Sequence, residues 1–289
     1  MEKLLHWSIV NAQGDKEEIA KAGAPDPRLL EQLFGKGNQV DDPTLMKEAL
    51  LVAKNKVATA ENRIIALENF EMLIENLDNA NNIENMKMWE PLINLLVEEN
   101  LEIVALVCSI IGTAVQNNVD SQTNFTKYEN GMKTLIELAN TTSNIDVKIK
   151  ALYALSNTIR NNEKASAKFK ELNGLDVISP ILKDKTVKPK IKLRTINLLS
   201  AYMSTININE EFVTALRKDN IISTIIERLQ EDTDLNLIDR ILNFLSQLYA
   251  SKIKLTDAEK ATLEKGFNSI QHLQDSLNEE DFASTKSFL

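Results

Sequence analysis

Apolar residues recur along this chain with a period in the low forties, and that period constrains the fold more than any other feature of the sequence. Two columns of apolar positions share it. The first advances by 43, 43 and 47 residues through Leu92, Leu135, Ile178 and Ile225. The second advances by 37, 44, 44 and 46 residues through Ile74, Ile111, Leu155, Leu199 and Leu245. Such periods in a helical chain are typical of α-solenoids, in which each unit buries its apolar face only against its neighbours.

The composition favours long helices and a protein partner. The 289 residues are 43% hydrophobic and include only 8 glycines and 6 prolines, so the chain has ample material for a core and few helix breakers. The net charge of -9 argues against nucleic acid as the main partner, because phosphates repel an acidic surface. We therefore expect a partner protein with a basic or polar surface.

The cysteine content and the longest apolar run indicate a soluble cytoplasmic protein. Cys108 is the single cysteine, so no disulfide forms within the chain and a reducing compartment is favoured. It lies in the apolar run 103–115, which predicts a small buried side chain rather than a reactive thiol. The run has 13 residues, fewer than the roughly 20 that span a bilayer, and the N-terminus lacks the pattern of a signal peptide. We expect no membrane partner.

The first 39 residues differ from the rest of the chain. Helix breakers at 23–27 and 35–38 flank one short predicted helix near residues 28–34, which indicates a flexible N-terminal region over residues 1–39. Asp41 and Asp42 followed by Pro43 suit the start of a helix. We predict a repeat domain over residues 40–289, with about four repeats, an N-terminal cap and a C-terminal cap that begins at Asp257.

The clearest unit, residues 151–183, resembles the armadillo consensus. Its third helix ends in the pattern Ala-Leu-x-Asn at 154–157, and its short first helix ends near Gly174. Gly131 lies 43 residues before Gly174, and both stand at a corner that needs a residue free of Cβ restrictions. The pair Asn161-Asn162 is likewise repeated one unit earlier, at 117–118. We predict an all-α fold, a right-handed α-solenoid of armadillo-like repeats with helical caps.

In such a solenoid the third helices line the concave side, and their non-core stripe faces a partner. Taking Asn157 as the reference and shifting by the repeat length gives a polar stripe rich in Asn. Its positions are Asn69, Met72, Asn76 and Asn79; Leu106, Ser109, Thr113 and Gln116; Lys150, Tyr153, Asn157 and Arg160; Arg194, Asn197, Ala201 and Ser204; and Arg240, Asn243, Gln247 and Ala250. The stripe contains a basic ladder of Lys150, Arg194 and Arg240. An ordinary solvated helix face is the other interpretation of this stripe.

Residue patterns that carry catalysis or bind metal are absent from the sequence. His6 and His272 are the two histidines and lie far apart, which gives a zinc site or a catalytic triad little to work with. The Gly-Lys-Gly at 35–37 lacks the spacing of a phosphate loop. We predict that the protein is not an enzyme and that it needs neither a metal nor a cofactor.

Several segments resemble one known family. The sequence 66–82, which ends in Glu-Asn-Leu-Asp-Asn-Ala-Asn-Asn, and the Trp-Glu-Pro-Leu at 89–92 resemble the first repeats of the Fes/HspBP family. Residues 25–27, 33–35 and 42–49 resemble the leader of its fungal members. These proteins are armadillo-type nucleotide exchange factors for the heat-shock protein 70 chaperones, and the resemblance covers essentially the whole chain.

The resemblance implies a mechanism without covalent chemistry. The concave groove would embrace one lobe of the chaperone's ATPase domain and favour its open form, so that ADP leaves, ATP enters and the client is released. It also implies partner-binding residues on the stripe and beside it: Asn76, Ala80, Thr113, Lys150, Tyr153, Asn157, Arg194, Asn197, Arg240 and Asn243. Ala80, because it is small, and Arg194, because it donates hydrogen bonds, are the strongest candidates. Helix-end packing of Ala80 and an exposed salt bridge of Arg194 are the structural alternatives.

Two other functions compete with nucleotide exchange. Armadillo adaptors that read basic peptides pair a Trp with an Asn four residues later, but the corresponding column here consists of Met72, Ser109, Tyr153, Asn197 and Asn243. A scaffold that holds two proteins together is the second rival. The apolar segment 4–10 either packs on the array as a cap or imitates a client peptide. We expect a monomer whose partner is the ATPase domain of heat-shock protein 70.

Overall fold

A computed structural model of the chain describes residues 40–231 and 234–289, and these residues form helices joined by loops, with no strand among them. The chain divides into two compact units, Met1–Leu45 and Met46–Leu289. The short helix expected near residues 28–34 and the apolar segment 4–10 lie outside the described residues. The helices of the repeats all fall within the second unit.

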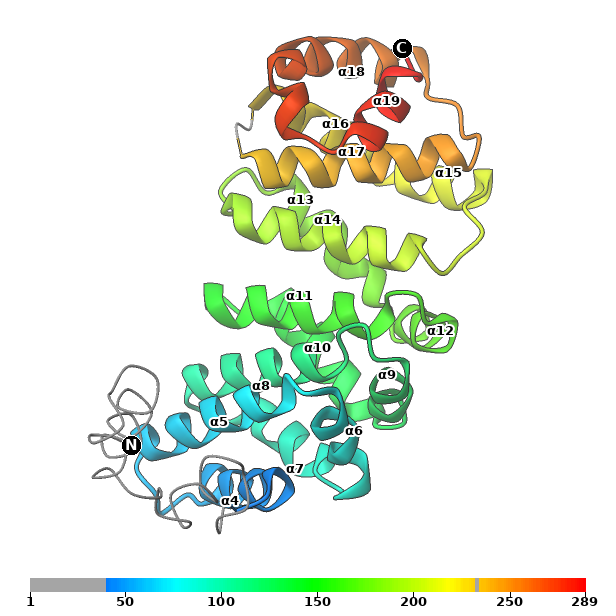
Figure 1. Cartoon of the computed structure of the whole chain (residues 1–289). Coiled ribbons are helices and arrows are strands. Elements are labelled where there is room, and N and C mark those ends of the chain that lie inside the picture. Colours follow the sequence, from blue (N-terminus) through cyan, green and yellow to red (C-terminus); the bar gives the residue numbers. More distant parts are fainter. Residues whose placement is uncertain (1–39, 232–233) are drawn as a thin grey trace, which may run out of the picture. The chain divides into compact units, whose positions relative to one another are not determined.

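The long helices of the second unit form one continuous layer. This third-helix layer consists of α5 (Ala60–Ile74), α8 (Leu101–Ala114), α11 (Ile145–Ile159), α14 (Pro189–Met203) and α17 (Leu235–Ala250). Each of these helices packs against the next one in chain order, as Figure 1 shows. The layer therefore carries one exposed face that runs across successive repeats.

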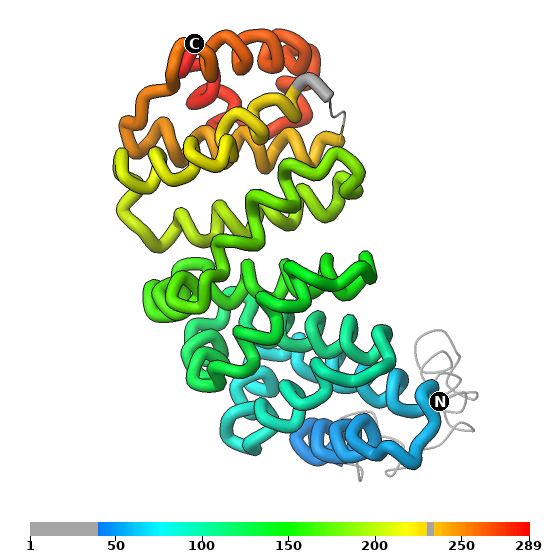
Figure 2. Tube along the Cα trace, turned by 180° about the vertical axis from the view of Figure 1, so that it is seen from behind, coloured from blue at the N-terminus to red at the C-terminus, as the bar shows by residue number. Residues whose placement is uncertain are grey.

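Shorter helices cover the other side of this layer. The first helices are α6 (Leu77–Asn85), α9 (Val119–Thr126), α12 (Glu163–Glu171) and α15 (Glu210–Lys218). The second helices are α7 (Trp89–Asn94) with η1 (Leu95–Val97), α10 (Glu129–Thr141), η2 (Gly174–Val177) with α13 (Ile178–Lys183), and α16 (Ile221–Glu231). Figure 2 shows them from the opposite side. Before the array lies α4 (Asp42–Lys54), and after it lie α18 (Asp257–Ile270), η3 (Gln271–Ser276) and α19 (Glu279–Lys286).

The two apolar columns of the sequence form the core. All nine of their side chains are at most 1% exposed. The first column lies on the second helices and the second column on the third-helix layer, so the anchors come from the second and third helices and not from the first helices. An all-α solenoid is thereby confirmed, and the burial of these anchors between neighbouring units contributes to its stability.

The Asn pairs of the sequence form the turns that lead into the first helices. Asn117 and Asn161 adopt left-handed backbone conformations, with φ of 50° and 55°. Asn118 and Asn162 follow as N-caps, and their side chains accept hydrogen bonds from the backbone N–H groups three residues ahead, at 3.2 and 3.0 Å. Asn suits both positions, because it tolerates positive φ and has a short side-chain acceptor.

The two corner glycines are needed for close packing and not for their backbone dihedrals. A Cβ at Gly174 would lie 2.2 Å from the ring of Phe169, and a Cβ at Gly131 would lie 2.8 Å from the ring of Phe125. Gly131 lies inside α10, and the left-handed residue at the later corner is Asn173, with φ of 58°. The expected freedom from a Cβ is therefore confirmed, and its cause is the phenylalanine that each first helix places against the second helix.

Candidate interaction surface

The exposed face of the third-helix layer begins with a polar network across α5, α8 and α11. Glu71 accepts hydrogen bonds from the hydroxyls of Ser109 and Thr113, the latter at 3.2 Å. Lys150 donates to Ser109 Oγ at 2.8 Å. Ser109 is itself buried, so it joins Glu71 to Lys150 and leaves Thr113 and Lys150 closer to the surface. Three successive repeats are held in register by this network.

The centre of the face is built around the half-buried ring of Tyr153 on α11. Its hydroxyl donates to Gln116 Oε1 at 2.9 Å, and the guanidinium carbon of Arg194 lies 5.1 Å from the ring centroid. A cation at this distance from an aromatic face is attracted by the ring. The Asn157 amide donates to the carbonyl of Gly112 at 3.1 Å, which joins α11 to α8. Tyr153 thus connects helices on both sides of α11.

Arg194 has hydrogen-bonding capacity that the described residues do not use. Its Nε atom is buried and has no hydrogen-bond partner in the described part of the chain. The guanidinium is held over Tyr153 and is partly exposed, so its other nitrogens can reach a partner. Because Tyr153 already holds the planar Arg194 guanidinium in place, this side chain loses less entropy on binding a carboxylate or a carbonyl than a freely rotating arginine would.

The face becomes more positive toward α17. Burial, and secondly the positive charge of Arg240, lower the pKa of the Arg160 guanidinium, which donates to the carbonyl of Asn197 at 3.3 Å. Arg240 and Lys150 are exposed and Arg194 is partly exposed. These three cations lie on one face of a chain whose net charge is -9.

Two of the predicted contact residues have structural roles, and for Ala80 this is the helix-end packing that was the alternative interpretation of the sequence. Ala80 on α6 is 3% exposed within the core, and its carbonyl accepts a hydrogen bond from Ser121 at 3.3 Å. This corrects the expectation that Ala80 lies open to a partner. Asn243 donates to Asp281 on α19 at 3.1 Å. In Figure 1, α19 lies across α17, so the C-terminal cap occupies this part of the stripe.

The remaining stripe positions are divided between surface and core. Asn76 is exposed and caps α6 by accepting from the backbone of Asp78 at 2.9 Å, and Asn197 is half-buried. Ala201 is fully buried, which corrects its placement on the exposed stripe. Met72 is 70% exposed and continues the face on α5.

Glu71 belongs to the polar network of this face but was missed by the predicted stripe. It lies one position before Met72 and therefore beside the predicted column, not in it. The sequence did place an acidic residue beside a stripe that contains cations. The spacing of residues does not show, however, that the Glu71 carboxylate reaches Ser109 in the next repeat.

No group of three or more His, Cys, Asp or Glu side chains is placed to hold a metal ion in the part of the chain that the structure describes. Nor does any helix within 40–231 or 234–289 combine the length and apolarity needed to cross a membrane.

The fold and this face define an all-α repeat protein of the armadillo type. A solved engineered protein is similar, with a TM-score of 0.66, 15% identity, and coverage of 87% of this chain and 96% of the other. A designed armadillo repeat protein in complex with the peptide (KR)4 has a TM-score of 0.65 at 15% identity, with 86% and 98% covered. At these identities the likeness concerns the fold alone.

Sequence comparisons identify the family. The sequence model of the family described as nucleotide exchange factor Fes1 matches residues 1–83, and the model of the SIL1/FES1/HPBP1 C-terminal domain matches residues 79–288. The chain belongs to the SIL1/FES1/HPBP1 family, which confirms the resemblance seen in the sequence.

Curated relatives match the chain over nearly its full length, and all three described here are named Hsp70 nucleotide exchange factor FES1. The protein of Saccharomyces cerevisiae is 55% identical, with 100% of both chains covered. That of Candida glabrata is 56% identical, with 99% of this chain and 98% of its own covered. The relative from Yarrowia lipolytica is 31% identical, with 97% and 95% covered.

Proposed function

We propose that this protein is a nucleotide exchange factor for Hsp70, which binds the chaperone's ATPase domain and accelerates the release of ADP. The observation that carries the proposal is the match to curated Hsp70 nucleotide exchange factors over the whole chain, at 55% identity for one of them. Family membership over residues 79–288 supports the same function for the repeats. The protein acts as a co-chaperone and not as an enzyme.

The mechanism rests on linkage between two ligands of the chaperone. A protein that binds the open ATPase domain more tightly than the closed one shifts the population toward the open form. Because linkage is reciprocal, ADP weakens this protein's binding by the same factor by which this protein weakens ADP binding. Release of ADP then allows ATP to enter and the client to leave. The protein supplies only binding energy to this cycle.

The third-helix layer supplies the contact surface in this proposal. In this proposal Lys150, Tyr153, Asn157 and Arg194 form its centre. They lie on the neighbouring helices α11 and α14, where Arg194 stacks on Tyr153 and hydrogen bonds join Lys150 and Asn157 to α8. Toward the two ends it continues through Asn76 and Thr113, and through Asn197 and Arg240. Ala80 and Asn243 act indirectly, since their packing positions α6 and α17.

The site of action and the chain organisation are part of the proposal. A cytoplasmic location is supported by the single cysteine, which is free and buried. The protein acts as a monomer, with an N-terminal region over residues 1–39 and a repeat domain over residues 40–289.

Stopped-flow release of a fluorescent ADP from a cytosolic Hsp70, chased with excess ATP, tests the function. We expect this protein to accelerate release at least about tenfold, equivalent to roughly 1.4 kcal/mol off the barrier. No acceleration at saturating protein would reject exchange activity and favour an adaptor that reads peptides.

Arg194→Ala tests the surface. We expect it to weaken binding to the isolated ATPase domain about tenfold, because a planar donor at the centre of the face is lost. Lys218→Ala is the matched control, since Lys218 is exposed on α15, away from the third-helix layer. Equal affinity of the two variants would place the interface elsewhere.

A further inference from the structure

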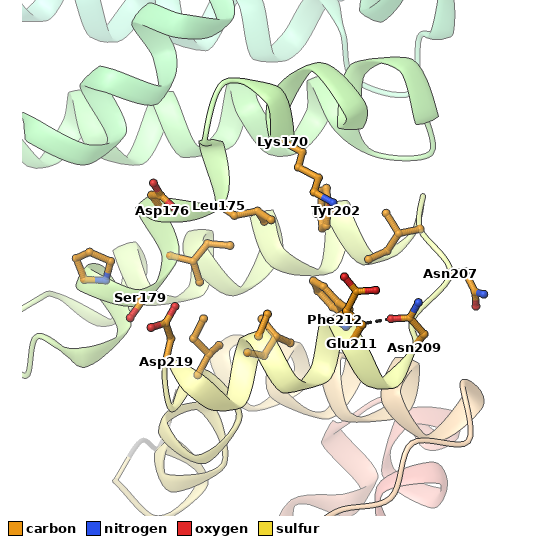
Figure 3. A pocket seen from close by; sticks show the side chains of 16 residues that line it. Lys170, Leu175, Asp176, Ser179, Tyr202, Asn207, Asn209, Glu211, Phe212 and Asp219 are labelled. Atoms are coloured by element: carbon orange, nitrogen blue, oxygen red, sulfur yellow. Dashed lines mark hydrogen bonds between the residues drawn. The ribbon is translucent and has the colours of Figure 1, made fainter.

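A hollow of about 600 Å³ opens away from the exposed face of the third-helix layer. Its walls come from the end of α12, from η2 and the start of α13, and from α15 with the start of α16 (Figure 3). From α14 only Tyr202 lines it. The volume lies within the range of about 300–1,000 Å³ that is usual for ligand sites.

The hollow lies where the two hydrophobic clusters of the compact unit Met46–Leu289 meet. Tyr202 belongs to the N-terminal cluster, whereas Ile178 and Leu216 belong to the C-terminal cluster. Leu175 and Phe212 pack against both clusters and remain partly exposed. Side chains of this protein therefore leave apolar surface open to a ligand at this junction.

A tyrosine whose ring is mostly buried brings a hydroxyl group to the hollow. Tyr202 is 4% exposed, and its ring lies 6.3 Å from that of Phe169 and 6.0 Å from that of Phe212. A tyrosine hydroxyl is protonated at neutral pH and burial raises the pKa of Tyr202 further, so this hydroxyl can donate to a carbonyl group.

Three exposed carboxylates stand at the rim of the hollow. Asp176 on η2 and Asp219 at the end of α15 lie toward one end, and Glu211 lies toward the other end, beside Asn209 (Figure 3). None of the three forms an ion pair within residues 40–231 and 234–289. Among the lining residues that the structure describes, Lys170 is the one cation, so these residues give the rim a net negative charge.

We propose that this hollow binds an extended peptide segment in which one or two apolar side chains are flanked by lysine or arginine. The apolar side chains would cover Leu175 and Phe212, and the hydroxyl of Tyr202 would donate to a backbone carbonyl of the peptide. The basic side chains would pair with the carboxylates at the two ends. Exposed ion pairs add little affinity, so the rim selects the peptide and the apolar wall holds it.

An array of nine-residue peptides of varied composition, probed with the full-length protein, tests the proposal. Ala215 is exposed on α15 and lines the hollow, so Ala215→Trp fills the site without disturbing the core. Thr214→Trp is the matched control, because Thr214 is exposed on the same helix and does not line the hollow. Equal thermal midpoints of the two variants establish that both are folded.

We expect the peptides that bind the control but not Ala215→Trp to be enriched in apolar residues flanked by Lys or Arg. The strongest of them, labelled with fluorescein, should bind Asp219→Lys at least about threefold more weakly in an anisotropy titration. This charge reversal leaves α15 intact, since a cation suits the C-terminal end of a helix. Glu227→Lys, at an exposed position on α16 outside the hollow, should bind like the unmodified protein.

Three results would overturn the proposal. The first is that Ala215→Trp and its control bind the same peptides on the array. The second is that the selected peptides are acidic. The third is that the protein self-associates in sedimentation experiments and that Ala215→Trp abolishes this association. The last result would assign the hollow to a second copy of the chain. The test does not use nucleotide exchange, so its outcome is independent of the proposed function.

Discussion

Replacing Gly112 by alanine tests how the third-helix layer packs around Tyr153. Gly112 lies in α8, and a Cβ there would stand 2.4 and 2.5 Å from two ring carbons of Tyr153 on α11. It would also lie 3.2 Å from the Cα of Ala154. The ring must therefore move, which weakens its hydrogen bond to Gln116 and its contact with Arg194.

Two opposing terms determine the effect of Gly112→Ala on the free energy of unfolding. Alanine gains about 1 kcal/mol over glycine inside a helix. Overpacking against the ring costs about 1–3 kcal/mol. We expect a net loss of about 1 kcal/mol. In a Tyr153→Ala background the ring is absent, so the same substitution should stabilise the protein by up to about 1 kcal/mol. The coupling between the two sites is then about 2 kcal/mol.

Urea unfolding of the original protein, the two single variants and the double variant measures this coupling. Coincident transitions by circular dichroism and tryptophan fluorescence would show two-state unfolding, which is needed to obtain free energies of unfolding from the urea curves. We predict that Gly112→Ala changes the sign of its effect on the free energy of unfolding between the two backgrounds. Equal stabilisation in both backgrounds would refute the packing argument and show that α8 and α11 separate at little cost.

Three further outcomes follow from buried groups. Burial raises the pKa of the Cys108 thiol to about 12, so iodoacetamide at pH 8 should label the folded protein only as it unfolds, and labelling within minutes would contradict its burial. Burial raises the pKa of Glu259, but hydrogen bonds from Arg217, at 3.0 and 2.9 Å, and from the backbone of Thr256 outweigh it and hold the pKa below its ordinary value. The Glu259 carboxylate therefore stabilises the protein at pH values above its ordinary pKa, and this stability is lost as the pH falls through its pKa in the folded protein. Glu259→Gln should lower the free energy of unfolding by about 2 kcal/mol at pH 7 and weaken the dependence of the thermal midpoint on acidic pH. Ala80→Arg should lower the thermal midpoint strongly, because it forces a charge into the core between α6 and α9. An unchanged midpoint would show that Ala80 is exposed and not buried.

The sequence by itself determined the repeat, its helices and its buried anchors. Leu92 and Leu155 were identified by spacing alone, because each repeat must bury the same positions against its neighbours. Asn118 and Asn162 were found in the same way, since every first helix needs a cap of the same chemistry. The family was also contained in the sequence, in segments such as residues 75–82.

Only the tertiary structure decided which side chains of the stripe remain available. Periodicity reports which side of a helix is buried, but it does not report what a neighbouring helix adds to the exposed side. Ala201 faces a neighbour, and Asn243 is covered by α19, although both share the spacing of exposed positions. The place of Tyr153 depends on contacts with α8 and α14 that join residues about forty positions apart. Such contacts depend on how successive repeats stack, which the pattern within one repeat does not specify.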